Sequence, residues 1–144
     1  MARAIGINHV ALEVGDVDEA LAWYGRFLEF DLRGRRPTMA WIDMGDQFLA
    51  LSSGRREGRD EGRHFGLVVD DKEAVRAALA DAGVEVSVSG GLRFRDPWGN
   101  AVEIVDYRDV QFTKAPAILA ALVPDGVEKS AAALEELARK GLAG

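Results

Sequence analysis

The sequence contains no cysteine among its 144 residues. This absence excludes disulfide bonds, thiolate metal sites and cysteine nucleophiles, and it is compatible with an intracellular location. Only two histidines are present, so any imidazole chemistry depends on His9 and His64. Basic residues are in the minority, with 18 Lys and Arg against 24 Asp and Glu. This balance argues against nucleic acid or an anionic membrane as a partner.

Long hydrophobic runs are also lacking. No apolar segment approaches the roughly 20 residues that a membrane-spanning helix needs, and the first residues do not form the apolar region of a signal peptide. We therefore expect a cytoplasmic protein without a membrane partner. Hydrophobic residues still make up 48% of the chain, which is enough to form the core of an ordinary domain.

The two histidines introduce two similar stretches of sequence. After each histidine, leucine, valine and aspartate recur at the same offsets. Later in each stretch, a glycine and a small polar residue precede an apolar segment, first at Gly45 and again at Gly99. Because both features recur at nearly the same spacing, the sequence predicts two similar modules.

Each module is predicted to follow the order β-α-β-β-β, which makes the fold class α+β. Alternating apolar residues indicate the strands, and Asp16 is a candidate cap for the first helix. In module one, about residues 5–53, strands are expected at 7–14, 30–36, 39–44 and 47–53, with a helix at 17–28. In module two, about residues 63–107, strands are expected at 64–69, 84–88, 92–95 and 101–107, with a helix at 72–82.

The remaining segments connect and extend these modules. Residues 54–62 are charged and glycine-rich, which is typical of a linker. The two modules and this linker are expected to form one domain over residues 1–110. Residues 111–144 are expected to form a helical C-terminal extension, with helices at 116–123 and 128–140.

Strand alternation predicts which side chains point away from the helices. In the first strand these are His9 and Glu13, and in its repeat it is His64. In the last strand, Glu103 and Tyr107 are expected on the same concave face. Two imidazoles and one carboxylate suit a single Fe(II), Mn(II), Co(II), Ni(II) or Zn(II) ion. The sequence therefore predicts that His9, His64 and Glu103 bind one divalent metal ion.

A motif in module two points to a known family. The sequence Asp-Pro-Trp-Gly-Asn at residues 96–100 precedes the strand that contains Glu103, and both modules open with His-x-x-Leu. Over about residues 5–107 the chain resembles the vicinal oxygen chelate superfamily, which includes glyoxalases, bleomycin resistance proteins and extradiol dioxygenases. The resemblance implies two modules whose mixed sheets curl into a cup around a metal ion. It also implies a small-molecule substrate and a homodimer, often with exchanged modules.

One position departs from part of the family. The repeat places Leu49 opposite Glu103, where the resemblance to four-ligand members such as glyoxalase I would require a glutamate. Leucine can neither bind metal nor transfer protons, so the glyoxalase I reaction is not expected. Extradiol dioxygenases share the three ligands but usually add a further pocket histidine, and the chain has no third histidine.

Several other residues are expected to line the cup. Arg93 and Arg95 share one face of a short predicted strand whose other face is apolar. Their guanidinium groups are expected to point at the metal and to bind a carboxylate or phosphate. By the repeat, Met39 and Trp41 are expected to form an apolar and aromatic wall opposite them. Tyr107, at the end of the last predicted strand, is also expected to contact the substrate.

Together these features predict a metal-dependent enzyme that acts on a small, oxygen-rich and anionic substrate. Glu13, on the same strand face as His9, is the candidate acid or base that does not bind metal. The reaction class stays open among lyase, isomerase, group transferase and dioxygenase. The alternative is a binding protein that sequesters a drug or metabolite without turnover, as bleomycin-binding relatives do.

Overall fold

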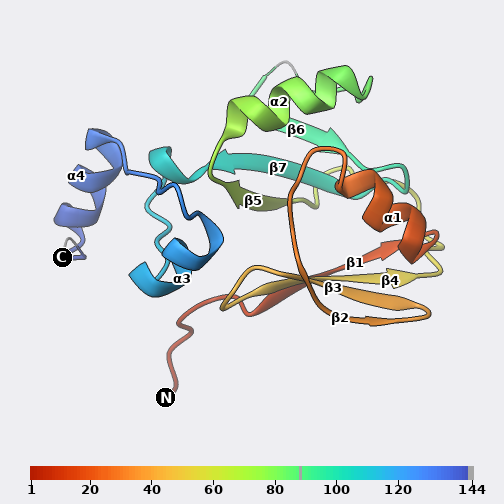
Figure 1. Ribbon diagram of the computed structural model, residues 1–144, viewed down its shortest axis with the longest axis horizontal. Coiled ribbons are helices and arrows are strands. Elements are labelled where there is room, and N and C mark those ends of the chain that lie inside the picture. The colour runs from red at the N-terminus through yellow and green to blue at the C-terminus, as the bar shows by residue number, and fades with distance from the viewer. Residues whose placement is uncertain (88, 143–144) are drawn as a thin grey trace.

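The computed structural model describes residues 1–87 and 89–142. Within these residues the chain forms two mixed β-sheets, four α-helices and one short 3-10 helix (Figure 1). The elements follow in the order β1 (His9–Val14), α1 (Val17–Tyr24), β2 (Leu32–Arg36), β3 (Met39–Asp43), β4 (Phe48–Ser53), β5 (Phe65–Val69), α2 (Lys72–Asp81), β6 (Leu92–Arg95), β7 (Ala101–Asp106), η1 (Tyr107–Asp109), α3 (Pro116–Leu122) and α4 (Ala131–Arg139).

The first sheet belongs to module one and has the strand order β1-β4-β3-β2. Strand β1 pairs with β4 in parallel, while β3 is antiparallel to both of its neighbours. One side of the sheet packs on the helices. We call the other side the first open face; its residues are His9, Ala11, Glu13, Met39, Trp41, Asp43, Phe48, Ala50 and Ser52.

The second sheet belongs to module two and has the order β5-β7-β6. Strand β5 is parallel to β7, and β6 is antiparallel to it. The strand predicted over residues 84–88 is reduced to one bridge between Val86 and Phe94, and Val88 lies outside the described residues. The second open face consists of Gly66, Val68, Arg93, Arg95, Ala101, Glu103 and Val105.

Both module helices begin in the same way, as the repeat predicts. The Asp16 carboxylate accepts a hydrogen bond from the Glu19 amide, and the Asp71 carboxylate accepts one from the Ala74 amide. Each carboxylate thereby satisfies an amide that has no partner inside its helix. The second helix is followed by Gly83 with a φ of 68°, a conformation in which glycine is favoured over other residues.

The helix-facing sides of both sheets contribute to a single hydrophobic core. The aromatic rings of Trp23 and Phe27 in α1 lie with their centroids 5.7 and 5.3 Å from that of Phe94 in β6. Figure 1 shows α1 between the two sheets at one end of the molecule. The modules therefore pack through their helix sides, and the two open faces point away from this core. The α+β class, the two modules and the helical C-terminal segment are all confirmed.

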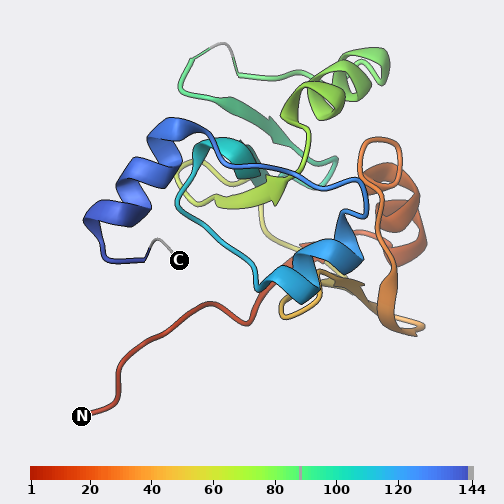
Figure 2. The same ribbon diagram turned by 60° about the vertical axis from the view of Figure 1, so that its left-hand side comes forward.

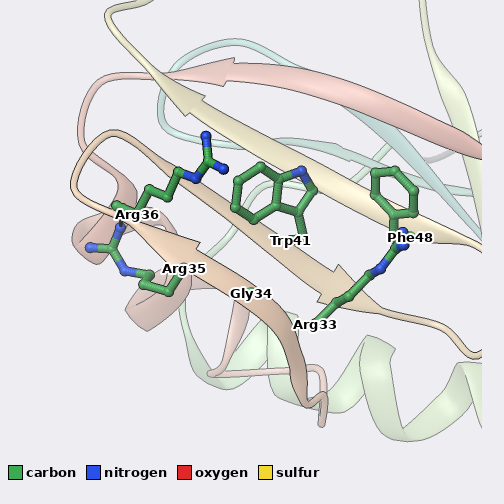
Figure 3. A pocket seen from close by; sticks show the side chains of 6 residues that line it. All are labelled: Arg33, Gly34, Arg35, Arg36, Trp41 and Phe48. Carbon is green, nitrogen blue, oxygen red and sulfur yellow. Dashed lines mark hydrogen bonds between the residues drawn. The ribbon is translucent and has the colours of Figure 1, made fainter.

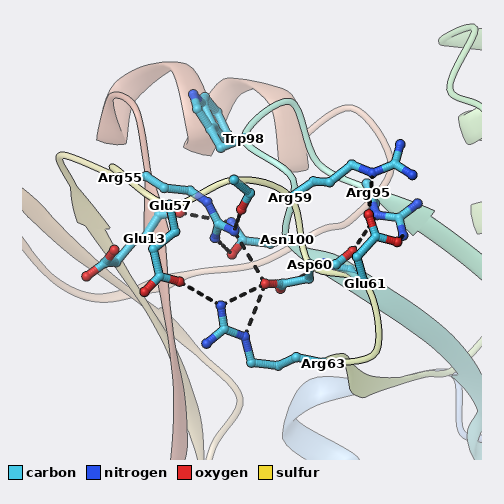
Figure 4. A network of polar contacts seen from close by, with 12 residues as sticks. Glu13, Arg55, Glu57, Arg59, Asp60, Glu61, Arg63, Arg95, Trp98 and Asn100 are labelled. Carbon is cyan, nitrogen blue, oxygen red and sulfur yellow. Dashed lines mark hydrogen bonds and ion pairs between the residues drawn. The ribbon is translucent and has the colours of Figure 1, made fainter.

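The segment between the modules is held more firmly than a flexible linker would be. The side chains of Arg55 and Asp60 are only 6% and 8% exposed and lie 3.4 Å apart. Arg63 donates to the same Asp60 oxygen over 2.8 Å, and Arg55 donates to the Asn100 side chain (Figure 4). In addition, the Asp60 amide donates to the Gly99 carbonyl over 2.8 Å. This ion network fixes the junction to the turn before β7.

The C-terminal segment is attached to both modules. The Lys129 ammonium donates to the carbonyls of Tyr107, Val110 and Phe112, and it lies 3.5 Å from the centre of the Tyr107 ring. Burial lowers the pKa of Lys129. Helix α3 lies against the turn between β3 and β4, where Lys114 pairs with Asp46. Figure 2 shows the extended connection that leads from α3 to α4. No helix in residues 1–87 and 89–142 is both long and apolar enough to cross a membrane.

Candidate functional site

The strongest cluster of chemical groups lies on the second open face, around Glu103. Register places Gly66, Glu103 and Arg93 side by side across β5, β7 and β6. The His64 Nε2 atom lies 3.6 Å from Glu103 Oε2, and Arg93 Nη2 donates to the same oxygen over 2.9 Å. Gly66 contributes no side chain to this row, and the Glu103 side chain is 24% exposed. The structure therefore brings two of the three predicted metal ligands together.

The ring orientation of His64 suits a metal ligand. Its Nδ1 atom lies 3.1 Å from the Gly62 carbonyl oxygen. Because a carbonyl oxygen only accepts hydrogen bonds, Nδ1 carries the proton, and the lone pair of the neutral ring is on Nε2. That is the atom turned toward Glu103. A backbone carbonyl behind the ring is a common way for proteins to orient a histidine ligand.

His9 lies on the first open face, apart from the other two predicted ligands. Its ring stacks on Phe48 with centroids 4.7 Å apart and planes within 7°. Its Nδ1 atom contacts the Asn8 side-chain oxygen at 2.8 Å, which again leaves Nε2 available. Among residues 1–87 and 89–142, no group of three or more His, Asp and Glu side chains is arranged to hold a metal ion. One chain thus supplies a pair of donors at Glu103 and a separate imidazole.

The described residues could hold a metal ion only if donors from both open faces came together. His64 and Glu103 offer one imidazole nitrogen and one carboxylate on an exposed face, and both donor types suit the metals predicted above. Two protein donors are fewer than the three that catalytic zinc sites and non-heme iron sites use. Strand β1, which begins at His9, and strand β5, which follows His64, are each an edge of their sheet. Both imidazoles are therefore accessible to a second molecule.

The other residues predicted from the first strand lie where alternation places them. Glu13, Ser52 and Met39 form one row of the first open face, and Trp41 belongs to the next row. Glu13 is exposed. Its carboxylate forms no ion pair with any residue in the described part of the chain.

Arg93 and Arg95 both lie on the second open face and are exposed, as predicted from the pattern of their strand. Neither guanidinium is free of protein contacts. Arg93 is bound to Glu103, while Arg95 Nε donates to the Asp60 carbonyl over 2.9 Å and its Nη2 atom lies 3.8 Å from Glu61. An anionic ligand would have to compete with these carboxylates for either arginine.

The predicted position of Tyr107 is wrong. Strand β7 ends at Asp106, and Tyr107 begins the 3-10 helix η1, where its side chain is buried. The Asp106 carboxylate accepts from the Arg108 amide and so caps this turn. The tyrosine ring packs beneath Lys129 of the C-terminal segment. It therefore does not continue the face that carries Glu103.

The predicted equivalence of Leu49 and Glu103 is also wrong, by one residue. Ala11 pairs with Ala50 in the first sheet as Gly66 pairs with Glu103 in the second. Strand β4 begins three residues after Gly45, whereas β7 begins two residues after Gly99, so the first turn is one residue longer. Leu49 is 2% exposed and belongs to the core. Alanine, like leucine, cannot bind metal. The conclusion that the chain has no fourth metal donor at the position equivalent to Glu103 therefore still holds.

Sequence reasoning missed a surface cavity, wide open to solvent, on the first open face (Figure 3). Its volume is about 440 Å³, and its lining residues are Arg33, Gly34, Arg35, Arg36, Trp41 and Phe48. Of these, only Trp41 was expected near a ligand. The available signal was the Arg-Gly-Arg-Arg sequence at residues 33–36, which places three guanidinium groups in one short strand.

Comparison with known proteins agrees with this architecture. The family model described as the Glyoxalase/Bleomycin resistance protein/Dioxygenase superfamily matches residues 6–104. Crystal structures of lactoylglutathione lyase from Agrobacterium tumefaciens and of a genomically encoded fosfomycin resistance protein from Listeria monocytogenes are similar, each with a TM-score of 0.59. Their identities are 21% and 16%; the matches cover 73% and 72% of this chain, and 96% and 94% of theirs. None of the curated proteins matches the chain. At such identities the structural likeness establishes the fold alone.

Proposed function

This chain belongs to the Glyoxalase/Bleomycin resistance protein/Dioxygenase superfamily, and from that membership we propose that it is a metal-dependent enzyme acting on a small, oxygen-rich, anionic substrate. The observation that carries the proposal is the pair formed by His64 and Glu103. Their donor atoms lie 3.6 Å apart on an exposed face, and the Gly62 carbonyl orients the imidazole. A divalent Fe, Mn, Ni, Co or Zn ion bound there would polarise substrate oxygens.

The third ligand in this proposal is His9 of a second copy of the chain. Three features support the arrangement. His9 is exposed and belongs to no group of metal donors within residues 1–87 and 89–142, β1 and β5 are sheet edges, and both open faces point away from the shared core. In a two-fold symmetric dimer, the β1 edge of each chain would lie beside the β5 edge of the other. Each dimer would then contain two equivalent sites.

The remaining residues of the site have roles that follow from their positions. Arg93 donates a 2.9 Å hydrogen bond to the Glu103 oxygen that faces His64, and it therefore competes with a metal ion for that oxygen. Glu13 lies on the same face of β1 as His9, and its exposed carboxylate is the candidate to accept or return a proton at a substrate carbon or oxygen. Ala11, Ala50 and Gly66 leave space between these groups for a ligand.

Metal content measured on purified protein tests this proposal. We expect one ion per chain in the wild type. His64→Ala and Glu103→Gln should each lower the metal content at least about tenfold, since each removes a ligand. The matched control is Glu73→Gln, which makes the same change at an exposed carboxylate of α2 and should leave the content unchanged. Equally negligible metal in all four proteins would overturn the proposal and favour the sequestering protein instead.

A further inference from the structure

The cavity on the first open face has a polar side and an aromatic side. Its charged groups come from β2, and its rings come from Trp41 in β3 and Phe48 in β4. Figure 3 shows the Arg33 guanidinium beside Phe48 and the Arg36 guanidinium near one end of the Trp41 ring. The distances from Cζ to the ring centres are 4.8 Å and 5.6 Å, respectively.

Regular pairing with Met39 places Arg36 on this face, and an irregularity in β2 adds Arg33. In a regular strand, Arg33 and Gly34 would point to opposite sides. The pairing of β2 with β3 shifts between Leu32 and Gly34, as it does at a β-bulge, which re-aims the side chain at that position. Arg33 consequently lies over Phe48, on the same open face as Arg36. The intervening Arg35 points to the other side and pairs with Asp18 of α1.

Gly34 allows the Trp41 indole to lie close to the backbone of β2. A Cβ atom at residue 34 would come within 3.2 Å of Trp41 Cε3, a tight contact that would require the ring to shift by a few tenths of an ångström. Because glycine has no Cβ, the indole lies against the backbone of β2. The ring therefore forms a flat floor on the first open face, with an arginine at each end of the cavity.

The charges of Arg33 and Arg36 are not compensated within the protein. Among residues 1–87 and 89–142, neither guanidinium forms an ion pair or hydrogen bond, whereas Arg35 pairs with Asp18. Arg93 and Arg95 on the second open face are likewise engaged by carboxylates. Among the described arginines of the two open faces, those with donors available for an anion are therefore Arg33 and Arg36. Guanidinium groups bind carboxylates in a bidentate geometry.

We propose that this cavity binds the distal part of the substrate as a planar aromatic carboxylate, with its ring on Trp41 and against the edge of Phe48, and its carboxylate between Arg33 and Arg36. Phe48 also stacks on His9 with centroids 4.7 Å apart, so a ligand in the cavity extends toward the imidazole that the proposed metal site uses. The identification of this ligand as the substrate rests on the proposed function. The binding of an aromatic carboxylate in the cavity does not depend on that function.

The test uses 2-naphthoate as the probe and isothermal titration calorimetry as the readout, with full-length protein in excess EDTA. Two comparison compounds each lack one feature: 2-naphthamide has no charge, and cyclohexanecarboxylate has no aromatic ring. We expect 2-naphthoate to bind at least about tenfold more tightly than either, because only this compound uses both the guanidinium groups and the rings. Equal affinity for 2-naphthamide would overturn the role of the arginines.

Variants locate the binding. Arg33→Met combined with Arg36→Met should weaken 2-naphthoate binding at least about tenfold and leave 2-naphthamide binding unchanged. The control combines Arg76→Met with Arg139→Met, which removes the same charge from exposed positions on α2 and α4 and should have no effect. Unchanged 2-naphthoate affinity in the β2 variant would refute the assignment. Because EDTA removes metal from every sample, this outcome is independent of whether the metal site exists.

Discussion

At the scale of single residues, Glu103 is the position on which most of the site depends. Its side chain is 24% exposed and shares one oxygen between His64 and Arg93. Strand alternation was sufficient to predict from sequence that His64 and Glu103 leave the core on the same side. Alternation could not predict Arg33, since its direction depends on a bulge that the residue types do not signal. The spacing of the repeat misplaced Leu49, because one extra residue in the first turn reverses which side chains face the core.

The shared oxygen makes Arg93 a competitor for any cation bound at Glu103. We predict that Arg93→Met raises the affinity for divalent metal by about 1.4- to 5-fold, which corresponds to an exposed ion pair worth about 0.2–1 kcal/mol. Arg93 is 44% exposed, so solvent screening keeps the effect small. Titration against a competing chelator measures it, with Arg76→Met as the control. Weaker binding in Arg93→Met would instead mean that the arginine positions Glu103 for the metal.

At the scale of elements, periodicity and capping residues predict the helices and strands of both modules except at residues 84–88, where a single bridge replaces the expected strand. They do not predict the structure of the junction between the modules. Residues 54–62 carry glycines and charges of both signs, which is equally consistent with a solvated linker and with charges that pair with one another. Burial decides between the two, because Arg55 and Asp60 are withdrawn from water. The ion network thus depends on tertiary contacts with Asn100 and Gly99, which local sequence does not reveal.

Asp60→Asn tests the contribution of this network to stability. The substitution leaves the buried Arg55 guanidinium with a weaker partner, so we expect a loss of about 2–4 kcal/mol in the free energy of unfolding at pH 7. Urea denaturation measures the loss. Glu61→Gln, a neighbouring substitution at an exposed carboxylate, is the control and should change stability little. A similarly small effect of Asp60→Asn would show that the network does not stabilise the fold.

The stability of wild type and of Asp60→Asn should depend differently on pH. Burial alone would raise the pKa of Asp60, but hydrogen bonds from Arg63 and the Ala101 amide, the charge of Arg63 and a hydrogen bond from Arg55 lower it below its usual value of 3.8. A carboxyl whose pKa is lowered by folding stabilises the protein above its unfolded pKa, and this contribution is lost as the pH falls through the folded pKa. The stability difference between wild type and Asp60→Asn should therefore narrow below about pH 4. A constant difference down to pH 2 would contradict this explanation.

At the scale of the whole molecule, the internal repeat predicted two modules, and the structure confirms them. The repeat could not predict how the modules face each other. That arrangement depends on contacts such as those of Trp23 and Phe27 with Phe94, which join the helix sides of both sheets in one core. As a consequence, His9 and the pair of His64 and Glu103 lie on separate open faces of one chain, and the proposed site requires two chains.

Mixing two defective chains tests this central claim most directly. A heterodimer of a His9→Ala chain and a His64→Ala chain, isolated through two different affinity tags that are then removed, contains one site with both defects and one site with neither. We predict that each homodimeric variant binds no metal and that the heterodimer binds one ion per dimer, half the content of the wild type. A heterodimer as free of metal as both homodimers, beside a wild type that binds metal, would contradict a site shared between chains.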